Sequence, residues 1–215
     1  VAIVVVKQFF GGIGQNFVNP ALAGRIVLLT SFPVAMSTWT QPLTWTMSKL
    51  DGVTSASPLS SIHEMTSGGA APDVSLVEML IGWRAGCLGE TCAVALLLGG
   101  IYLVVRKVIS QTIPLTYIGT VAVIMLIAGK GDFRFVAYEL LGGGLMLGAI
   151  FMATDYTTSP ITFKGKIIFG IGCGLITSII RIFGNLPEGV SYSIIIMNIL
   201  VPLIENVTLP KPFGT

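Results

Sequence analysis

Charged residues are scarce in this sequence of 215 amino acids. Twelve are basic and ten are acidic, which makes 10% of the chain charged and gives a formal net charge of +2 at pH 7. Soluble domains carry about 25% charged residues, so the composition argues against a soluble globule. The small net charge argues against nucleic-acid binding. With 53% hydrophobic residues and a mean hydropathy of +0.87, a multi-pass protein of the lipid bilayer remains.

Histidine and cysteine are also few. The chain has one histidine, His63, and three cysteines. Cys87 and Cys92 are too far apart for a CxxC motif and do not share a helix face. We therefore expect neither a metal site nor a disulfide framework.

The first residues resemble the end of a hydrophobic helix. They are apolar, without an initiator methionine or a basic region, so they do not resemble a signal peptide. We expect residues 1–215 to form a single membrane domain, the C-terminal part of a longer chain.

Long apolar runs predict an all-α polytopic membrane helix bundle. A spanning helix needs about 20 mostly apolar residues, and the segments that come near this length are 85–105, 108–129, 135–154, 166–183 and 189–204. The last is shorter and is interrupted by Pro202. Upstream, 17–36 is weaker, with a helix start at Asn19-Pro20, and 75–83 suits a short re-entrant or interfacial segment.

Glycine spacing and one short similarity add detail to this fold. Gly144 with Gly148, and Gly170 with Gly174, have the GxxxG spacing of closely packed membrane helices. Residues 7–11 and 181–184 are similar and each precedes an apolar helix, which suits either an inverted repeat or chance. We expect broken or re-entrant helices within the bundle.

Residues 40–74 form the one long connection, and its proline and hydroxyl content suggests an ordered loop at the membrane surface. Alternation of the spans divides the basic residues between two faces. One face receives Arg106, Lys107, Lys164, Lys166 and Lys211, and the other Lys49, Lys130, Arg134 and Arg181. The positive-inside rule makes the first face cytoplasmic, which places residues 40–74 on the extracytoplasmic face.

Four ionisable residues lie inside the predicted spans: Arg25, Glu90, Glu139 and Arg181. Such groups are costly in lipid and usually face a partner or a cavity. Two interpretations stay open. The residues form a structural ion-pair cluster, or Glu90 and Glu139 line a vestibule for a translocated cation.

Several blocks of sequence, in order, resemble a known family. They are KQFFGGIGQN at 7–16, NPAL at 19–22, DGVTSASPL at 51–59, GGG at 142–144 leading to FMATD at 151–155, and RIFGNLPEGV at 181–190. The family comprises the D subunit of the Rnf complex and the related B subunit of the sodium-pumping NADH:quinone reductase, and the former fits better. The resemblance implies a membrane subunit of a ferredoxin:NAD+ oxidoreductase that exports Na+ or H+, in the cytoplasmic (inner) membrane.

The resemblance also implies a covalent flavin on the 40–74 loop. In this family FMN is attached through its phosphate to the hydroxyl that ends a Ser-Gly-Ala-Thr motif. The matching residues here are Thr54, Ser55, Ala56 and Ser57. Ser57 is therefore the expected attachment site, with serine in place of the usual threonine but with the same hydroxyl chemistry. A flavin transferase would make this bond outside the cytoplasm.

The family further implies a second, noncovalent flavin, such as riboflavin, in the helix bundle. The candidates to shape its site are Gly11, Gly12, Gly14, Asn16, Asn19 and Asp155. Other subunits of the Rnf complex are the implied partners.

Two rival functions stay open. A channel-like permease for a small solute would use the same broken helices without redox chemistry, and a structural subunit would have lost its flavin with the change to serine.

Overall fold

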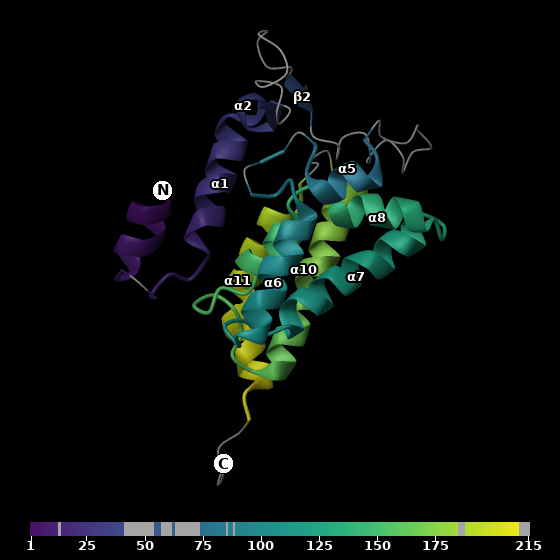
Figure 1. The fold of residues 1–215 in the computed structure, drawn as a ribbon. Coiled ribbons are helices and arrows are strands. Elements are labelled where there is room, and N and C mark those ends of the chain that lie inside the picture. The colour runs from purple at the N-terminus through teal and green to yellow at the C-terminus, as the bar shows by residue number, and fades with distance from the viewer. Residues whose placement is uncertain are drawn as a thin grey trace.

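The structure is a computed structural model that describes residues 1–12, 14–40, 54–56, 62, 74–84, 86–87, 89–184 and 188–210. It is a helical bundle with one short two-stranded ribbon (Figure 1). In chain order the elements are η1 (Ala2–Lys7), η2 (Gln8–Phe10), α1 (Pro20–Ser31), α2 (Pro33–Ser37), β1 (Thr38–Thr40), β2 (Thr54–Ala56), α5 (Leu76–Ile81), α6 (Ala93–Val105), α7 (Thr112–Ala128), α8 (Phe133–Leu141), α9 (Leu145–Leu147), η3 (Gly148–Met152), α10 (Phe163–Phe183) and α11 (Val190–Thr208).

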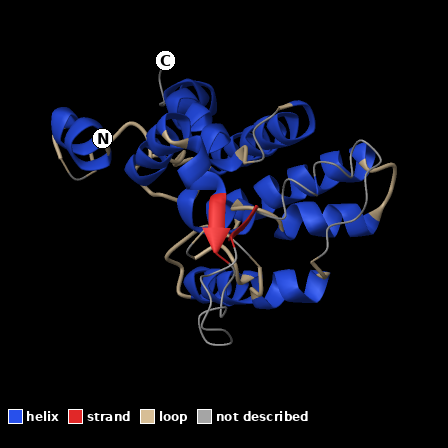
Figure 2. Ribbon diagram, turned by 90° about the horizontal axis from the view of Figure 1, so that it is seen from above, coloured by secondary structure: helices blue, strands red, loops and turns tan. Residues whose placement is uncertain are grey.

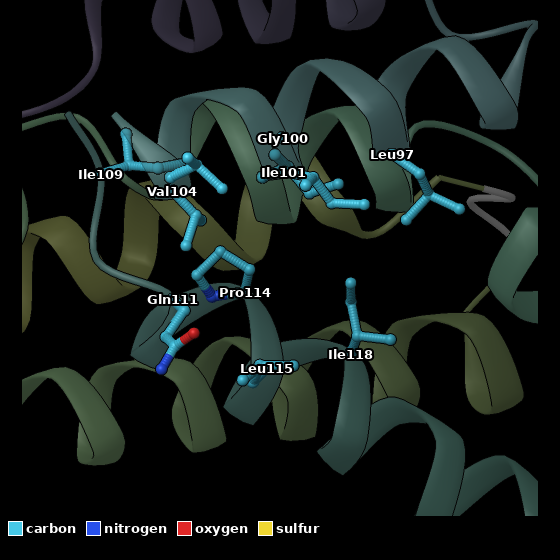
Figure 3. Close-up of a pocket in the computed structure, with 11 residues that line it drawn as sticks. Leu97, Gly100, Ile101, Val104, Ile109, Gln111, Pro114, Leu115 and Ile118 are labelled. Carbon is cyan, nitrogen blue, oxygen red and sulfur yellow. The ribbon is translucent and has the colours of Figure 1, made fainter. Parts of the chain in front are cut away.

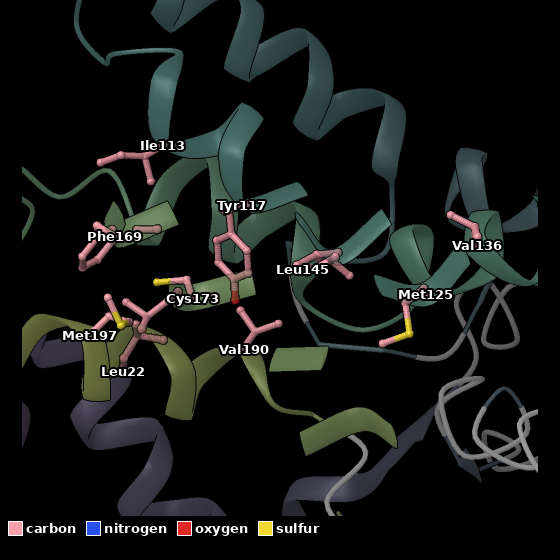
Figure 4. Packing of buried hydrophobic residues seen from close by; sticks show 14 of the residues in the cluster. Leu22, Ile113, Tyr117, Met125, Val136, Leu145, Phe169, Cys173, Val190 and Met197 are labelled. Atoms are coloured by element: carbon pink, nitrogen blue, oxygen red, sulfur yellow. The ribbon is translucent and has the colours of Figure 1, made fainter. Parts of the chain in front are cut away.

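Helices α7, α10 and α11 form the centre of the bundle, with α10 between the other two. Their apolar side chains pack with Leu22 of α1 around Tyr117, Phe169 and Cys173, and Val136 of α8 packs beside Met125 near the end of α7 (Figure 4). Tyr117 is fully buried, and its hydroxyl lies 2.6 Å from Thr177 Oγ1 and 2.9 Å from Ser193 Oγ. One hydroxyl cluster therefore joins the three helices where no water is available to satisfy these groups.

Glycines let α10 approach α7 closely, as the GxxxG spacing predicts. A Cβ at Gly174 would lie 2.6 Å from Thr120 Cβ and 3.1 Å from the Tyr117 carbonyl oxygen. The same approach brings Gly170 against Thr116. Membrane helices gain from such contacts because lipid supplies no hydrophobic force between them.

The prediction of an all-α membrane bundle with broken helices is confirmed. Within the described residues, α10 and α11 are each long and apolar enough to cross a membrane. Helix α8 and the segment Leu145–Met152 are together long and apolar enough to cross a membrane, but the chain bends by 66° between them. Helices α1, α6 and α7 are apolar but shorter.

The predicted span at 85–105 is wrong in its first half, because the helix begins only at Ala93. The Arg84 side chain donates hydrogen bonds to the carbonyl oxygens of Glu90, at 2.8 Å, and Thr91, at 3.3 Å. These bonds hold the backbone at 90–91 against the Arg84 side chain, and Gly89 has a φ of 85°. Glu90 therefore precedes helix α6 and does not lie a turn inside a span.

The predicted span at 135–154 is interrupted. Helix α8 ends at Leu141, and Gly143 has a φ of 60°, which glycine adopts without strain. Helix α11, in contrast, continues through Pro202 to Thr208, beyond the predicted end at 204. The predicted 17–36 segment is divided at Phe32 into α1 and α2.

The ends of the bundle carry different elements. The end of α2, the β1–β2 ribbon and α5 lie at one end, here called the ribbon end (Figure 1). The end of α6 and the start of α10 lie at the opposite end, here called the lysine end because Lys107, Lys164 and Lys166 lie there. Seen from above in Figure 2, the ribbon overlies the helices.

The close α7–α10 contact predicts a difference between two glycines. Gly174→Ala should destabilise the protein by about 1–3 kcal/mol, because the new methyl group meets the Thr120 stem and the Tyr117 carbonyl. Gly119→Ala is the control, since nothing lies within 4 Å of its Cβ position. Thermal unfolding in detergent measures both. Equal unfolding temperatures for the two variants would contradict this packing.

Candidate functional site

The expected FMN motif begins in strand β2. Thr54, Ser55 and Ala56 pair antiparallel with Thr40, Trp39 and Thr38 of β1. Ser57 itself lies outside the described residues. Ile62, five positions later, is fully buried in the hydrophobic core. In the sequence, the expected attachment residue therefore lies between a paired strand and a residue of the core.

The candidate glycines for the noncovalent flavin lie between η2 and α1. Gly11, Gly12 and Gly14 have φ values of 108°, 97° and 84°. Only glycine adopts this region readily, and at Gly12 and Gly14 no atom lies within 4 Å of the Cβ position. The backbone is thus open on this side, and a flat molecule could approach it closely.

The candidate asparagines join this segment to the bundle. Asn19 caps helix α1, as the Asn19-Pro20 pair predicts, because its Oδ1 accepts hydrogen bonds from the backbone N–H groups of Ala21, at 3.0 Å, and Leu22, at 3.3 Å. Asn19 Nδ2 donates to the Met152 carbonyl oxygen at 3.3 Å. With the Asn198 amide turned so that its nitrogen donates to Ile194 and Thr158, its oxygen accepts from the Asn19 N–H at 3.1 Å.

Asp155 belongs to the same network. Its Oδ2 accepts hydrogen bonds from Thr157, at 3.0 Å, and Thr158, at 3.2 Å. Asn16 Nδ2 donates to Thr157 Oγ1 at 3.1 Å and to the Val18 carbonyl oxygen at 3.1 Å. Asn16 and Asp155 are thus connected through one threonine, and the next threonine, Thr158, joins this network to Asn198 in the middle of α11. The start of α1 lies away from the β1–β2 ribbon (Figure 1).

Glu139 lies in a buried ion pair at the helix break. Arg181 Nη1 donates to Glu139 Oε2 at 2.8 Å and to the Glu139 carbonyl oxygen at 2.6 Å. Arg181 Nη2 donates to the Gly142 carbonyl oxygen at 3.2 Å. Both side chains are at most 3% exposed. Arg181 therefore binds the end of α8 as well as neutralising Glu139.

Glu90 belongs to a second ion-pair group nearby. Arg25 Nη2 lies 2.7 Å from Glu188 Oε2 and 3.5 Å from Glu90 Oε2. A Cβ at Gly144 would lie 2.8 Å from Glu188 Oε1 and 3.1 Å from Glu90 Oε2, so only glycine fits beneath the two carboxylates. Burial raises the pKa of the Glu188 carboxyl, and Arg25 opposes this rise.

Two carboxylate oxygens of this second group are incompletely satisfied. In the described part of the chain, Glu90 Oε2 and Glu188 Oε1 are buried and accept no hydrogen bond. The geometry favours a structural role for Glu139, whose carboxylate is held by Arg181, and leaves Glu90 more available to a cation or a proton. Sequence reasoning missed Glu188, because it lies in the connection between two spans. The sequence feature that could have identified Glu188 is its place in the 181–190 block, which resembles the family.

The buried pair predicts a large effect on stability. Arg181→Met should destabilise the protein by about 3–5 kcal/mol, because the Glu139 carboxylate and two carbonyl groups lose their donor. Arg134→Met is the control, since Arg134 is exposed and its backbone N–H, not its side chain, bonds to Asp132. Thermal unfolding in detergent measures the difference. An Arg181→Met protein as stable as the control would show that the pair does not hold the break.

Comparison with known proteins agrees with the resemblance. The family model described as "NQR2, RnfD, RnfE family" matches residues 1–214. The chain is 49% identical over 214 residues to the D subunit of the Na(+)-translocating ferredoxin:NAD(+) oxidoreductase complex of Acetobacterium woodii, covering 99% of this chain and 64% of that protein. It is 43% identical over 226 residues to the D subunit of the proton-translocating ferredoxin:NAD(+) oxidoreductase complex of Clostridium ljungdahlii, covering 100% and 66%.

A third relative is the D subunit of the ion-translocating oxidoreductase complex of Stutzerimonas stutzeri. It is 38% identical over 239 residues, with 99% of this chain and 68% of that protein covered. The chain thus spans about two thirds of the length of the curated relatives it matches, 64% and 66% for the first two. The match extends over nearly every residue and agrees with the membrane bundle. We conclude that the chain belongs to the NQR2, RnfD, RnfE family.

Proposed function

We propose that the chain is part of the D subunit of an Rnf-type complex, which couples electron transfer from ferredoxin to NAD+ to the movement of Na+ or H+ across the membrane. The observation that carries this proposal is the match to D subunits over 99–100% of the chain, at 38–49% identity. The apolar helices long enough to span a membrane, and the ion pair buried among the helices, further support a role in a membrane complex that moves ions.

FMN bound to Ser57 through a phosphoester is the proposed cofactor. When bound, it supplies electron-transfer chemistry that no amino-acid side chain of this chain offers as readily. What supports this site among the described residues is its position in the chain, since Ser57 follows strand β2 and precedes the buried Ile62. A serine oxygen is a suitable partner for a phosphoester, and attachment there leaves the flavin ring free.

A second, noncovalent flavin is proposed near the glycine segment. The open backbone at Gly12 and Gly14 supports this placement more than Asn16 and Asn19 do, because their amide groups already have partners within the chain. Asp155 likewise bonds to its own turn. Backbone groups would then contact the flavin, while the side chains hold the segment in place.

We further propose that the ribbon end faces outward from the cytoplasmic (inner) membrane. Lys107, Lys164 and Lys166 lie at the opposite end, which the positive-inside rule assigns to the cytoplasm. The flavin transferase would then reach Ser57 from outside, and the other Rnf subunits would pack around the bundle.

The covalent site predicts a specific pattern of flavin loading. Ser57→Ala, expressed in the complex with its transferase, should lose the fluorescent band on a denaturing gel, because no phosphoester can form. Ser57→Thr should keep the band, since threonine offers the same oxygen, and Ser60→Ala, which lies outside the motif, is the matched control that should keep it too. Peptide mass analysis of residues 50–80 locates the added mass.

The same measurement separates the rival functions. A native protein without any covalent flavin, made beside an active transferase, would favour the permease or a structural subunit that has lost its cofactor. A flavin retained in Ser57→Ala would move the attachment to another residue while leaving the electron-transfer function in place.

The two acidic residues predicted to serve ion movement can be tested separately. We expect Glu90→Gln to lower sodium- or proton-coupled activity several-fold, because its Oε2 is buried without a hydrogen-bond donor in the described residues. Glu139→Gln should mainly lower stability, since Arg181 loses its charge partner. Glu78→Gln, in the first turn of α5, is the control because glutamine preserves the capping box. Unchanged ion dependence in Glu90→Gln would assign Glu90 a structural role.

A further inference from the structure

An apolar groove separates two helices that follow one another in the chain. Helix α6 packs on α5, α9 and η3, so a wedge of about 360 Å³ remains between α6 and α7. Figure 3 shows the facing side chains of the two helices across this groove. The apolar lining includes Leu97, Ile101, Val104, Leu115, Ile118 and Ile150.

The floor of the groove is fixed by a close contact. A Cβ at Gly100 would lie 2.7 Å from Ile150 Cγ2, so α6 is already as close to η3 as glycine allows. Rotation of α6 toward α7 would have to break this contact. The walls are open to the outside, since Ile101 and Leu115 are 59% and 65% exposed. A volume of this size is typical of ligand sites, and in a bilayer it must contain something apolar.

Two basic residues lie at one end of the groove. The residues that line this end are Val104, Val105 and Ile109. Between Val105 and Ile109, the connection from α6 to α7 contains Arg106 and Lys107. Both basic residues are exposed, and in the part of the chain that the structure describes neither forms an ion pair with a carboxylate. The lining of the groove is therefore apolar apart from Gln111, and two positively charged residues follow the lining residue Val105 at its lysine end.

The backbone at Lys107 is unusual for a lysine. Its N–H bonds to the Val104 carbonyl oxygen at 2.9 Å, and the Val108 N–H bonds to the Leu103 carbonyl oxygen at 2.9 Å, which is a Schellman motif. Lys107 occupies the left-handed position with a φ of 57°, where glycine is preferred. A positive charge at a helix C-terminus is favourable in itself, so a test must separate this effect from ligand binding.

We propose that the groove binds an anionic phospholipid, with one acyl chain between α6 and α7 and the phosphate against Arg106 and Lys107. Charge complementarity selects this occupant over a zwitterionic lipid, because the two cations have no carboxylate partner in the described residues. The lysine end also carries Lys164 and Lys166, so the same leaflet would attract anionic lipids. This inference concerns the bilayer and does not depend on the bound flavin.

Native mass spectrometry of the detergent-purified complex tests the site. The complex is exchanged with phosphatidylglycerol or with phosphatidylcholine of the same acyl chains, and lipid retained on this protein is counted after its release from the complex. We expect phosphatidylglycerol to be retained at least 10-fold better. Arg106→Gln with Lys107→Gly should abolish this preference, while the glycine relieves the left-handed backbone and keeps the helix end intact.

The chain offers a matched control at the other end of α7. Lys130 occupies the same left-handed position, with a φ of 53°, and the same bonding pattern ends α7. Lys130→Gly should leave lipid retention unchanged. Leu115→Trp should lower it several-fold without changing any charge, because the larger side chain fills the groove.

Three results would overturn the proposal. The first is equal retention of the two lipids by the native complex, and the second is an undiminished preference in the Arg106→Gln, Lys107→Gly variant. The third is crosslinking of a photoreactive amino acid at Ile101 only to another subunit in the native complex, which would show that a protein helix fills the groove.

Discussion

The rest of the structure depends on Arg181 at the helix break. Lipid offers no water to satisfy free backbone groups, so a break inside a membrane needs its own hydrogen-bond partners. Arg181 supplies them from α10, by donating to the carbonyl oxygens of Glu139 at 2.6 Å and Gly142 at 3.2 Å. The Glu139 carboxylate, at 2.8 Å, balances its charge. One side chain thereby stabilises the bend and fixes it to a central helix.

The bend has a consequence for the acidic residues. It places Gly144 beneath Glu90 and Glu188, where any larger residue would displace their carboxylates. Arg25 reaches both carboxylates from α1, so elements far apart in the sequence meet at this point. The two charge groups differ in how well their oxygens are satisfied. The Glu139 carboxylate accepts a hydrogen bond from Arg181. The group at Glu90, in contrast, has buried carboxylate oxygens with no hydrogen-bond donor among the described residues.

Hydropathy and local signals predicted much of the fold, and tertiary hydrogen bonds explain what they missed. Residues 166–183 and 189–204 correspond to α10 and α11, and Asn19-Pro20 starts α1 as expected. The predicted start of the helix at residue 85 was wrong, because a hydropathy average does not register that Arg84 donates hydrogen bonds to carbonyl groups six and seven residues later. Glu188 was missed for a similar reason, since its partner Arg25 is 163 residues away. Family resemblance, not residue spacing, identified Ser57, and the inverted repeat stays a prediction.

A density map of the intact complex, prepared with its flavin transferase, tests the central claim most directly. We predict continuous density from the Ser57 oxygen to a phosphate and a three-ring system, at the end of the bundle where β1 and β2 lie. A bare serine oxygen with no flavin near it, in a map that resolves the surrounding side chains, would contradict the assignment of this chain as an electron carrier.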